Sequence, residues 1–592
     1  MLKKYIILAV FIIATTINCW VVKGAFAYNL SSNDELVEAP EVAVEVKKDD
    51  YREVGVSGSY LSSQFSRSSG DIENAIKSLK AVYQENDQNV EIANQLMGLY
   101  LLNGNVDNAM EIASNISKTN ATEPISALML SLLAIKNNDA VKASHILNEL
   151  SENEGGQLWL PLISAWLDVD QHKLLKPLVM EELSAEVGRA APIVNYHLAL
   201  INAQAGFINA AAENFKQSMI NPTYRSKRVM QMLLLFYKKH TSKVLKSLVA
   251  EYSKANRDEP KVETLVIDNM QDGTAEVLLT MGSIMLEADV IQDATLYLQL
   301  ALYLNPNIEI ATVKLAMAYG ELQQYGIANE LLAKIKPTSS LYNRAQLYIA
   351  INLGHLKNVD ESIVKLDKLI SESPDGIEAY MAKGDLLRSQ EKFADAIIVY
   401  EAALATLKEK TPRHWSIFFA IGTCFDRQGN WVEAEKNFKL SLELSPNQPD
   451  VLNYLGYSYL MRGENLKQAK KIIEKALKIR PTDPQIMDSM GWVLYTLGNY
   501  KQAVVYLEMA VSLLPADSTT NEHLGDVYWR LGRKTEARFQ WDRSLTYSKD
   551  EFTSQEVLKK LKYGLPQANS SDAVEKEEVV IPVSAAINEH SQ

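Results

Sequence analysis

The chain has few of the residues that mark several common protein classes. Among its 592 residues there are only 2 cysteines, 26 glycines and 18 prolines. Because Cys19 lies in an apolar amino-terminal segment, Cys424 has no second thiol to pair with in the body of the chain. A disulfide framework is therefore excluded. The low glycine and proline content disfavours a β architecture rich in loops.

Positive charge is also scarce, with 60 basic residues against 73 acidic residues and a net charge of −13. Binding along a phosphate backbone depends on Lys and Arg displacing counterions, so we expect no nucleic-acid partner. A hydrophobic content of 47% and a charged content of 22% exclude a multi-span membrane protein and wholesale disorder. Because one core seldom grows past about 250–300 residues, the length predicts several domains or a repeat array.

Sequence motifs of catalysis and metal binding are missing. The chain has no P-loop, GxSxG or HExxH motif, and its eight histidines are scattered. No pair of cysteines has the spacing of a zinc site. Cys424 follows Gly422 on an apolar segment, which favours a buried small side chain over a nucleophile. We therefore expect no catalytic residue, no metal and no cofactor, and we predict that the protein is not an enzyme.

A period of 34 residues runs through the second half of the chain. Its clearest unit is GWVLYTLGNYKQAVVYLEMAVSLLP, from Gly491 to Pro515. The small residue that opens this unit recurs at steps of 34, or of 35 and 38 where a connection is longer. Its eight consecutive positions are Gly282, Ala316, Ala350, Gly384, Gly422, Gly456, Gly491 and Gly525. Eight units in nearly constant register indicate a genuine repeat architecture.

Each unit has the pattern of two amphipathic helices. Apolar residues recur at steps of three and four, and connections such as Gly498-Asn499 are short enough to make the helices antiparallel neighbours. Pro515 and its equivalents end the second helix. We expect the small residue of the first helix to face a small alanine of the second. Since one hairpin cannot bury its apolar faces alone, the units must stack.

Small residue, aromatic, Ala, aromatic, Ala and Pro over 34 residues resemble the tetratricopeptide repeat (TPR) family. The resemblance covers roughly residues 59–548 and is strongest from residue 275 onward. Tryptophan is absent from the fourth position of the first helix, where Leu452, Met487 and Asn521 stand. The resemblance implies an all-α fold, a right-handed superhelical α-solenoid of TPR-like helix hairpins.

Seven segments follow from these patterns. They are a signal peptide (1–27), a disordered acidic linker (28–58), divergent TPR-like repeats (59–223), a degenerate helical segment with a long loop (224–274), a regular TPR array (275–548), a capping helix (549–565) and a disordered tail (566–592).

The amino-terminal segment has the pattern of an export signal. Lys3 and Lys4 precede a short apolar run, and Ala25-Phe26-Ala27 fits a cleavage site for a signal peptidase. We predict cleavage after Ala27 and a periplasmic or secreted protein. Two alternatives remain open: the segment is retained as an anchor, or Cys19 is lipidated, and only these imply membrane association. The body of the chain is exported in every case.

The TPR resemblance also implies a binding surface. In that family the first helices line a concave groove, with inward positions three before, one after and four after the small residue. The predicted partner-binding residues are Phe419, Asp426, Asn453, Tyr457, Asp488, Trp492, Tyr495, Asp526, Trp529 and Arg530. Aromatic and Arg side chains dominate the energetics of protein interfaces. The alternative is that Tyr457, Trp492 and Trp529 pack between adjacent units.

The order of segments is similar to that of exported bacterial envelope TPR proteins, which include adaptors for carboxyl-terminal processing proteases. The stretches SRSSGDIENAIKSL and NYLGYSYL show this likeness. We expect an exported scaffold or adaptor that binds a protein or peptide partner in its groove, in the cell envelope, and delivers substrates to a processing protease. The alternative is a structural component of an envelope assembly or of secretion or outer-membrane biogenesis.

Overall fold

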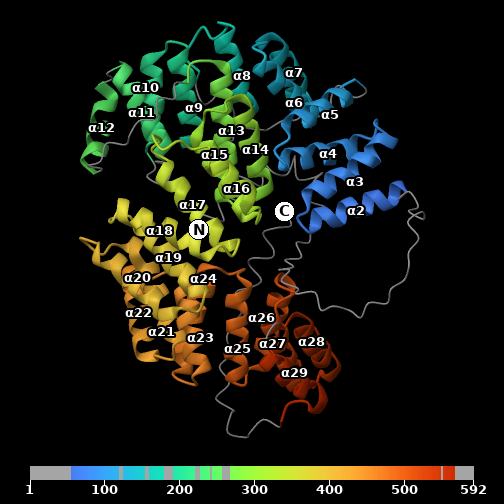
Figure 1. Ribbon diagram of the computed structural model, residues 1–592, viewed down its shortest axis with the longest axis vertical. Coiled ribbons are helices and arrows are strands. Elements are labelled where there is room, and N and C mark those ends of the chain that lie inside the picture. The colour runs from blue at the N-terminus through green and yellow to red at the C-terminus, as the bar shows by residue number, and fades with distance from the viewer. Residues whose placement is uncertain are drawn as a thin grey trace. The chain divides into compact units, whose positions relative to one another are not determined.

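A computed structural model describes residues 55–118, 124–153, 159–178, 191–220, 227–240, 243–255, 267–548 and 551–566 (Figure 1). These ranges contain 28 α-helices and no strand. The chain divides into two compact units, which we call unit 1 (up to Ser373) and unit 2 (from Pro374).

The helices of unit 1 are α2 (Val56–Ser68), α3 (Ile72–Glu85), α4 (Val90–Leu102), α5 (Val106–Ile116), α6 (Pro124–Lys136), α7 (Ala140–Asn153), α8 (Trp159–Asp170), α9 (Ala191–Gln204), α10 (Ile208–Ser218), α11 (Lys227–His240), α12 (Lys243–Ala255), α13 (Met270–Glu287), α14 (Ile291–Leu304), α15 (Glu309–Glu321), α16 (Tyr325–Leu332), α17 (Tyr342–His355) and α18 (Val359–Glu372).

The helices of unit 2 are α19 (Ile377–Ser389), α20 (Phe393–Ala405), the 3-10 helix η4 (Pro412–His414), α21 (Trp415–Arg427), α22 (Trp431–Leu444), α23 (Pro449–Met461), α24 (Leu466–Ile479), α25 (Pro484–Thr496), α26 (Tyr500–Leu513), α27 (Ser518–Arg530), α28 (Lys534–Tyr547) and α29 (Glu551–Tyr563).

Helix hairpins are the building block of both units. The pairs α13–α14, α21–α22, α25–α26 and α27–α28 are among the most extensively packed. A second helix also packs against the first helix of the next hairpin, as α26 does with α27 and α28 does with α29. This stacking of each hairpin on its neighbour is the construction of a solenoid. The predicted all-α solenoid of helix hairpins is confirmed.

Where the small residue of a regular repeat is glycine, it lies against a large apolar side chain of the second helix, rather than against a small alanine as we expected. A Cβ atom added to Gly491 would lie 2.5 Å from Leu507 Cγ, and one added to Gly525 would lie 2.4 Å from Trp541 Cδ1. Ala537, which we expected opposite Gly525, contributes its carbonyl oxygen at 3.1 Å. Since these distances are shorter than van der Waals contact, a side chain added at Gly491 or Gly525 would clash unless its neighbour moved.

Local signals set the ends of the helices. The carboxylate of Asp483 caps α25, accepting hydrogen bonds from the backbone N–H groups two and three residues later at 3.0 and 3.2 Å. After α25, Gly498 adopts a φ of 77°, in the left-handed region that favours glycine, and donates its N–H to the carbonyl of Tyr495 at 2.9 Å. Pro515 stands just after α26, where it prevents continuation.

Two of the predicted segment boundaries differ from the structure. Helix α2 begins at Val56, inside the segment 28–58 that we expected to be a linker. Helix α13 begins at Met270, inside the segment 224–274 that we expected to end in a loop. Asn269 caps α13 by accepting a hydrogen bond from the N–H of Asp272 at 2.8 Å, so the polar residues there are a helix start. The predicted signal peptide (1–27), most of the linker and residues 567–592 lie outside the described residues.

Candidate partner-binding site

The predicted binding residues lie on the first helices of unit 2, and their side chains meet across neighbouring first helices. Asp488 of α25 contacts His523 of α27, and Tyr495 of α25 contacts Arg530 of α27. Both pairs are separated by 35 residues, about one repeat. Equivalent positions of successive first helices therefore share one face of unit 2.

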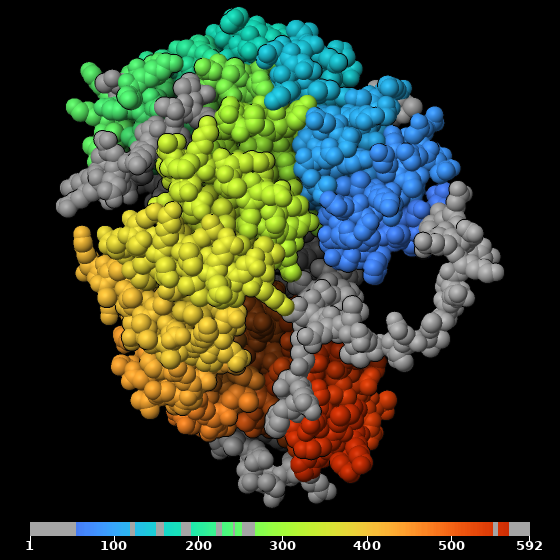
Figure 2. All heavy atoms as spheres, viewed as in Figure 1, coloured from blue at the N-terminus to red at the C-terminus, as the bar shows by residue number. Residues whose placement is uncertain are grey.

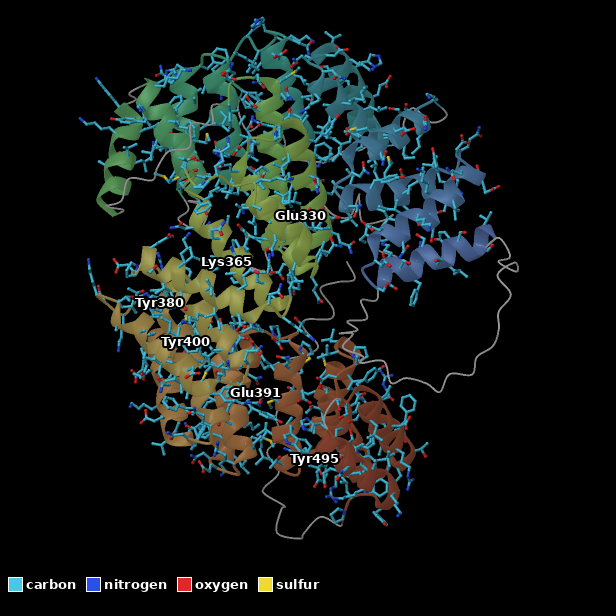
Figure 3. All side chains as sticks on the ribbon, viewed as in Figure 1. Glu330, Lys365, Tyr380, Glu391, Tyr400 and Tyr495 are labelled. Atoms are coloured by element: carbon cyan, nitrogen blue, oxygen red, sulfur yellow. The ribbon has the colours of Figure 1, made fainter. Side chains whose placement is uncertain are left out.

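A stack of three rings forms the centre of this face. Trp492 stacks on Tyr495 with a centroid distance of 4.6 Å and an interplanar angle of 7°. His523 stacks on Trp492 at 3.9 Å and 12°. Trp492 and Tyr495 are half-buried, so part of each ring stays open to solvent (Tyr495 is labelled in Figure 3). We call Trp492, Tyr495 and His523 the stacked cluster.

Asp488 holds the histidine of the stacked cluster in place. Its carboxylate lies 2.9 Å from Nδ1 of His523, and both side chains are buried. Burial on its own lowers the pKa of His523, but the charge and hydrogen bond of Asp488, with Asp526 and Glu522 nearby, raise that pKa above its usual value. The pair therefore favours a protonated imidazolium stacked on an indole, a cation–π arrangement.

Tyr457 on α23 reports the sign of the electrostatic potential on this face. Burial, followed by the charges of Asp488, Glu522 and Asp517, raises the pKa of the Tyr457 hydroxyl to about 12. Three carboxylates near one half-buried ring make this part of the face negative. One helical turn earlier, Asn453 has a buried Oδ1 without a hydrogen-bond partner. The face thus combines aromatic surface, negative charge and an unpaired acceptor.

Phe419 and Asp426 on α21 make contacts between repeats. Phe419 packs edge to face on Tyr454 of α23 at 5.7 Å. Asp426 accepts hydrogen bonds from the Tyr454 hydroxyl at 3.0 Å and from Arg462 at 2.9 Å, and the Arg462 guanidinium lies over the Trp431 ring at 4.4 Å. These contacts join α21 to the next hairpin, so both residues stabilise the stacking of repeats.

Asp526, Trp529 and Arg530 lie beneath the carboxyl-terminal helix α29. Trp541 Nε1 donates to Asp526 at 2.9 Å, and Lys560 of α29 binds the same carboxylate at 2.8 Å. Arg530 donates to the carbonyl of Pro566 at 2.5 Å. A Cβ atom added to Gly564 would lie 2.0 Å from the Trp529 ring. Trp529 is therefore better described as a packing residue than as an open binding position.

The face contains residues that the sequence analysis did not single out. His523, Asp517 and Lys560 belong to it through their contacts with Asp488, Tyr457 and Asp526. The signal that was available is the repeat spacing: His523 stands 35 residues after Asp488, and Lys560 stands 34 after Asp526. A search for opposite charges one repeat apart would have found both pairs.

Catalytic chemistry finds little support in the described part of the chain. Burial raises the pKa of the Cys424 thiol to about 11, which disfavours the thiolate that a nucleophile needs. No three His, Cys, Asp or Glu side chains of the described residues gather in a group able to hold a metal ion. Within the same residues, no helix has both the length and the apolar character needed to cross a membrane.

Comparison with known proteins gives the family of these repeats. Family models for the tetratricopeptide repeat match residues 66–132, 349–407, 381–449, 450–483 and 489–551. A TPR repeat-containing protein of Pseudomonas aeruginosa is 29% identical over 185 residues, which are 31% of this chain and 29% of that protein. Tetratricopeptide repeat protein 13 of Homo sapiens is 27% identical over 140 residues, 24% of this chain and 16% of that protein. The matches thus span less than a third of these relatives.

Among solved structures, a chain of the Cut9–Hcn1 hetero-tetramer of the APC/C is 15% identical, and the match covers 86% of this chain and 96% of that one. The TM-score of this match is 0.38.

Proposed function

Because the chain is a tetratricopeptide-repeat protein, we propose that it is a scaffold that binds a segment of another protein on the first-helix face of unit 2. The observation that supports this most strongly is the stacked cluster: Trp492 and Tyr495 stay partly exposed while Asp488 and His523 are buried beneath them. A rigid, half-exposed aromatic surface supported by buried polar contacts is typical of an interface hot spot.

The chemistry of the face favours a particular class of segment. Asp488, Asp517 and Glu522 make the surroundings of Tyr457 negative, and the half-buried Tyr457 ring adds aromatic surface beside them. A Lys or Arg side chain would gain both from the carboxylates and from the rings. The proposed partner segment is therefore apolar and basic, and the chain itself performs no chemistry on it.

We further propose that the protein works after export, in the cell envelope, as an adaptor that brings substrates to a processing protease. Support comes from the sequence pattern of residues 1–27 and from a bacterial relative with the same repeats. Cell fractionation with amino-terminal sequencing tests the location. A mature chain that begins at Tyr28 in the exported fraction is expected, and an intact chain in the cytoplasm would overturn the proposal.

Site-specific crosslinking tests the binding face. The photo-crosslinker p-benzoylphenylalanine at Tyr457 should capture one defined partner, whereas the same residue at Val432, 74% exposed on the second helix α22, should not. With that partner purified, Trp492→Ala should weaken binding about tenfold or more, because hot-spot aromatics contribute at this level. Val432→Ala is the matched control and should bind like the parent.

Two results separate the possible outcomes. Equal crosslinking at Tyr457 and Val432, or unchanged affinity of Trp492→Ala with unchanged helicity, would show that the face is not the binding surface. Capture of a protease with its substrates supports the adaptor. A stable complex of fixed stoichiometry without a protease supports instead a structural component of an envelope assembly.

A further inference from the structure

One hairpin of unit 1 is buried far more completely than a hairpin of a regular solenoid. Helix α13 has buried residues around its whole circumference, including Gly273, Thr274, Ala275, Glu276, Val277 and Leu278 in succession. Helix α14 is a second helix, yet it buries Tyr297 and Leu300 as well as the residues that face α13. A helix covered on every side must have neighbours beyond its own hairpin and the next.

Those neighbours are helices far away in the sequence. Helices α13 and α14 contact α4, α5, α6, α8 and α9, and four of these five are first helices or occupy first-helix places in the alternation. Figure 1 shows α13 to α16 between α2–α6 on one side and α9–α12 on the other. Figure 2 shows atoms of the α2–α5 region directly against those of α14–α16. In a regular solenoid each hairpin contacts only its neighbours.

On the side of α8 and α9, one face of α13 makes three specific contacts. A Cβ atom added to Gly273 would lie 2.1 Å from the buried ring of Trp166 on α8. Three residues later, Glu276 accepts a hydrogen bond from the Tyr196 hydroxyl of α9 at 2.6 Å. Another turn on, Thr280 lies 3.1 Å from Nε2 of His197, the residue that follows Tyr196. Steps of three and four residues place all three on one face of α13.

The carboxylate at the centre of this face is paired inside unit 1. Arg228 of α11 donates two hydrogen bonds to Glu276, at 3.1 and 2.7 Å, while Glu276 has a side chain only 1% exposed. Burial alone would raise the pKa of Glu276, but Arg228 and the Tyr196 hydroxyl lower it. Glu276 therefore stays ionised in the interior of unit 1, where neutral neighbours alone could not compensate for its lost hydration.

On the opposite side, the ends of helices cap one another across the chain. Lys136, at the end of α6, donates to the carbonyl oxygens of Tyr303 and Leu304 at 2.5 and 3.1 Å, 167 and 168 residues away. The Tyr319 hydroxyl of α15 donates to the carbonyl of Leu102 at the end of α4, 217 residues away. Carbonyl groups at the end of a helix have no partner within it, so these bonds satisfy acceptors that water would otherwise take.

We propose that the first-helix face formed by α4, α6, α8 and α9 already has its partner within the chain, and that this partner is the α13–α14 hairpin. The occupant fits because α13 presents a small residue to Trp166, a carboxylate to Tyr196 and Arg228, and a hydroxyl to His197. This face of unit 1 is therefore closed to other proteins. The conclusion that other proteins bind only at unit 2 rests on the proposed function.

Hydrogen–deuterium exchange of the full chain tests the internal contact without any partner. Gly273→Ala places a methyl group where the Trp166 ring lies, and should increase exchange in α8, α9 and α13 together by about tenfold or more. Gly98→Ala is the matched control, because Gly98 lies inside α4 and its Cβ would meet nothing within 4 Å. It should leave these rates unchanged.

A second variant acts on the other side of the hairpin. Lys136→Met removes the donor to Tyr303 and Leu304 and should increase exchange at the ends of α6 and α14 without unfolding unit 1. Faster exchange in α13 alone, with α8 and α9 at parent rates in Gly273→Ala and with α6 and α14 unchanged in Lys136→Met, would overturn the proposal. Because no partner is present, this outcome is independent of the Trp492→Ala binding test.

Discussion

At the scale of residues, His197 and His523, both buried, show how neighbours decide the charge of the same side chain. In unit 1, burial lowers the pKa of His197 to about 4, and Glu276 only partly opposes this shift. In unit 2, burial also opposes protonation of His523, but Asp488, with Asp526 and Glu522, reverses the direction and raises its pKa. The difference is a carboxylate 2.9 Å from the ring.

The two histidines predict opposite dependences of stability on pH. The folded pKa of His523 lies above its unfolded value, so its contribution is complete below about pH 6.5 and is lost as the pH rises through the folded pKa. The folded pKa of His197, about 4, lies below the unfolded value, so acidification from about pH 6.5 towards 4 destabilises the fold.

Urea unfolding of the full chain between pH 4 and 9 measures both effects. His523→Gln should lose the decline of stability above about pH 6.5, and His197→Gln should lose the decline below it. Parallel pH profiles of the two variants and the parent would show that neither histidine titrates differently in the folded state.

At the scale of elements, α29 stacks on the last hairpin of the described residues, α27–α28. It takes the position of a first helix, since Lys560 binds Glu522 and Asp526 of α27 at 2.7 and 2.8 Å. The Lys560 side chain is 18% exposed, whereas that of the adjacent Lys559 is 64% exposed and pairs only with Glu556 of its own helix. Lys560 therefore joins α29 to α27, whereas Lys559 lies on the solvent-exposed side of α29.

Substitution of these two lysines separates the two contributions. Lys560→Met leaves Asp526 and Glu522 without their cation and should destabilise unit 2 by about 3 kcal/mol, because a buried carboxylate loses its partner. Lys559→Met should change stability by no more than about 0.5 kcal/mol, as exposed pairs do. Thermal unfolding of both variants measures the difference. Equal stability would show that α29 is held by apolar contacts alone.

At the scale of the whole molecule, the two units differ in the range of their contacts. The hairpins of unit 2 are joined by side-chain bonds about one repeat apart, such as the one between Asp488 and His523. Unit 1 adds bonds across 80, 167 and 217 residues that connect α13, α14 and α15 to α9, α6 and α4. Long-range contacts make distant segments depend on one another, whereas nearest-neighbour stacking allows graded loss of structure.

The two units should therefore unfold with different cooperativity. In hydrogen exchange at increasing urea concentration, peptides from α4, α8, α9, α13 and α14 should respond with a common midpoint. Peptides from α19 to α28 should give graded midpoints, lowest at the ends of the array. Graded midpoints throughout unit 1 would contradict this expectation.

By itself, the sequence determined the helices, their pairing and the face that the first helices of unit 2 share. These properties depend on contacts within one period, so a repeat of 34 residues encodes them at the same positions of every unit. For that reason Tyr457, Asp488, Trp492 and Tyr495 were predicted on one face, and His523 was within reach of the same reasoning.

Only the tertiary structure decided which of the predicted residues stay open and which are covered. Tyr495 and Trp529 occupy equivalent positions, four residues after Gly491 and Gly525, but the Trp529 ring has the backbone of Gly564, just after α29, packed against it. Asp272 and Gly273 were predicted to lie in a loop, because the sequence pattern does not show why a glycine stands there. The reason is the Trp166 ring, from more than 100 residues earlier, which lies against Gly273. A period describes neighbours one repeat apart. Contacts between residues that are 80 to 217 positions apart do not appear in the periodic sequence pattern, because they depend on how the chain curves in space.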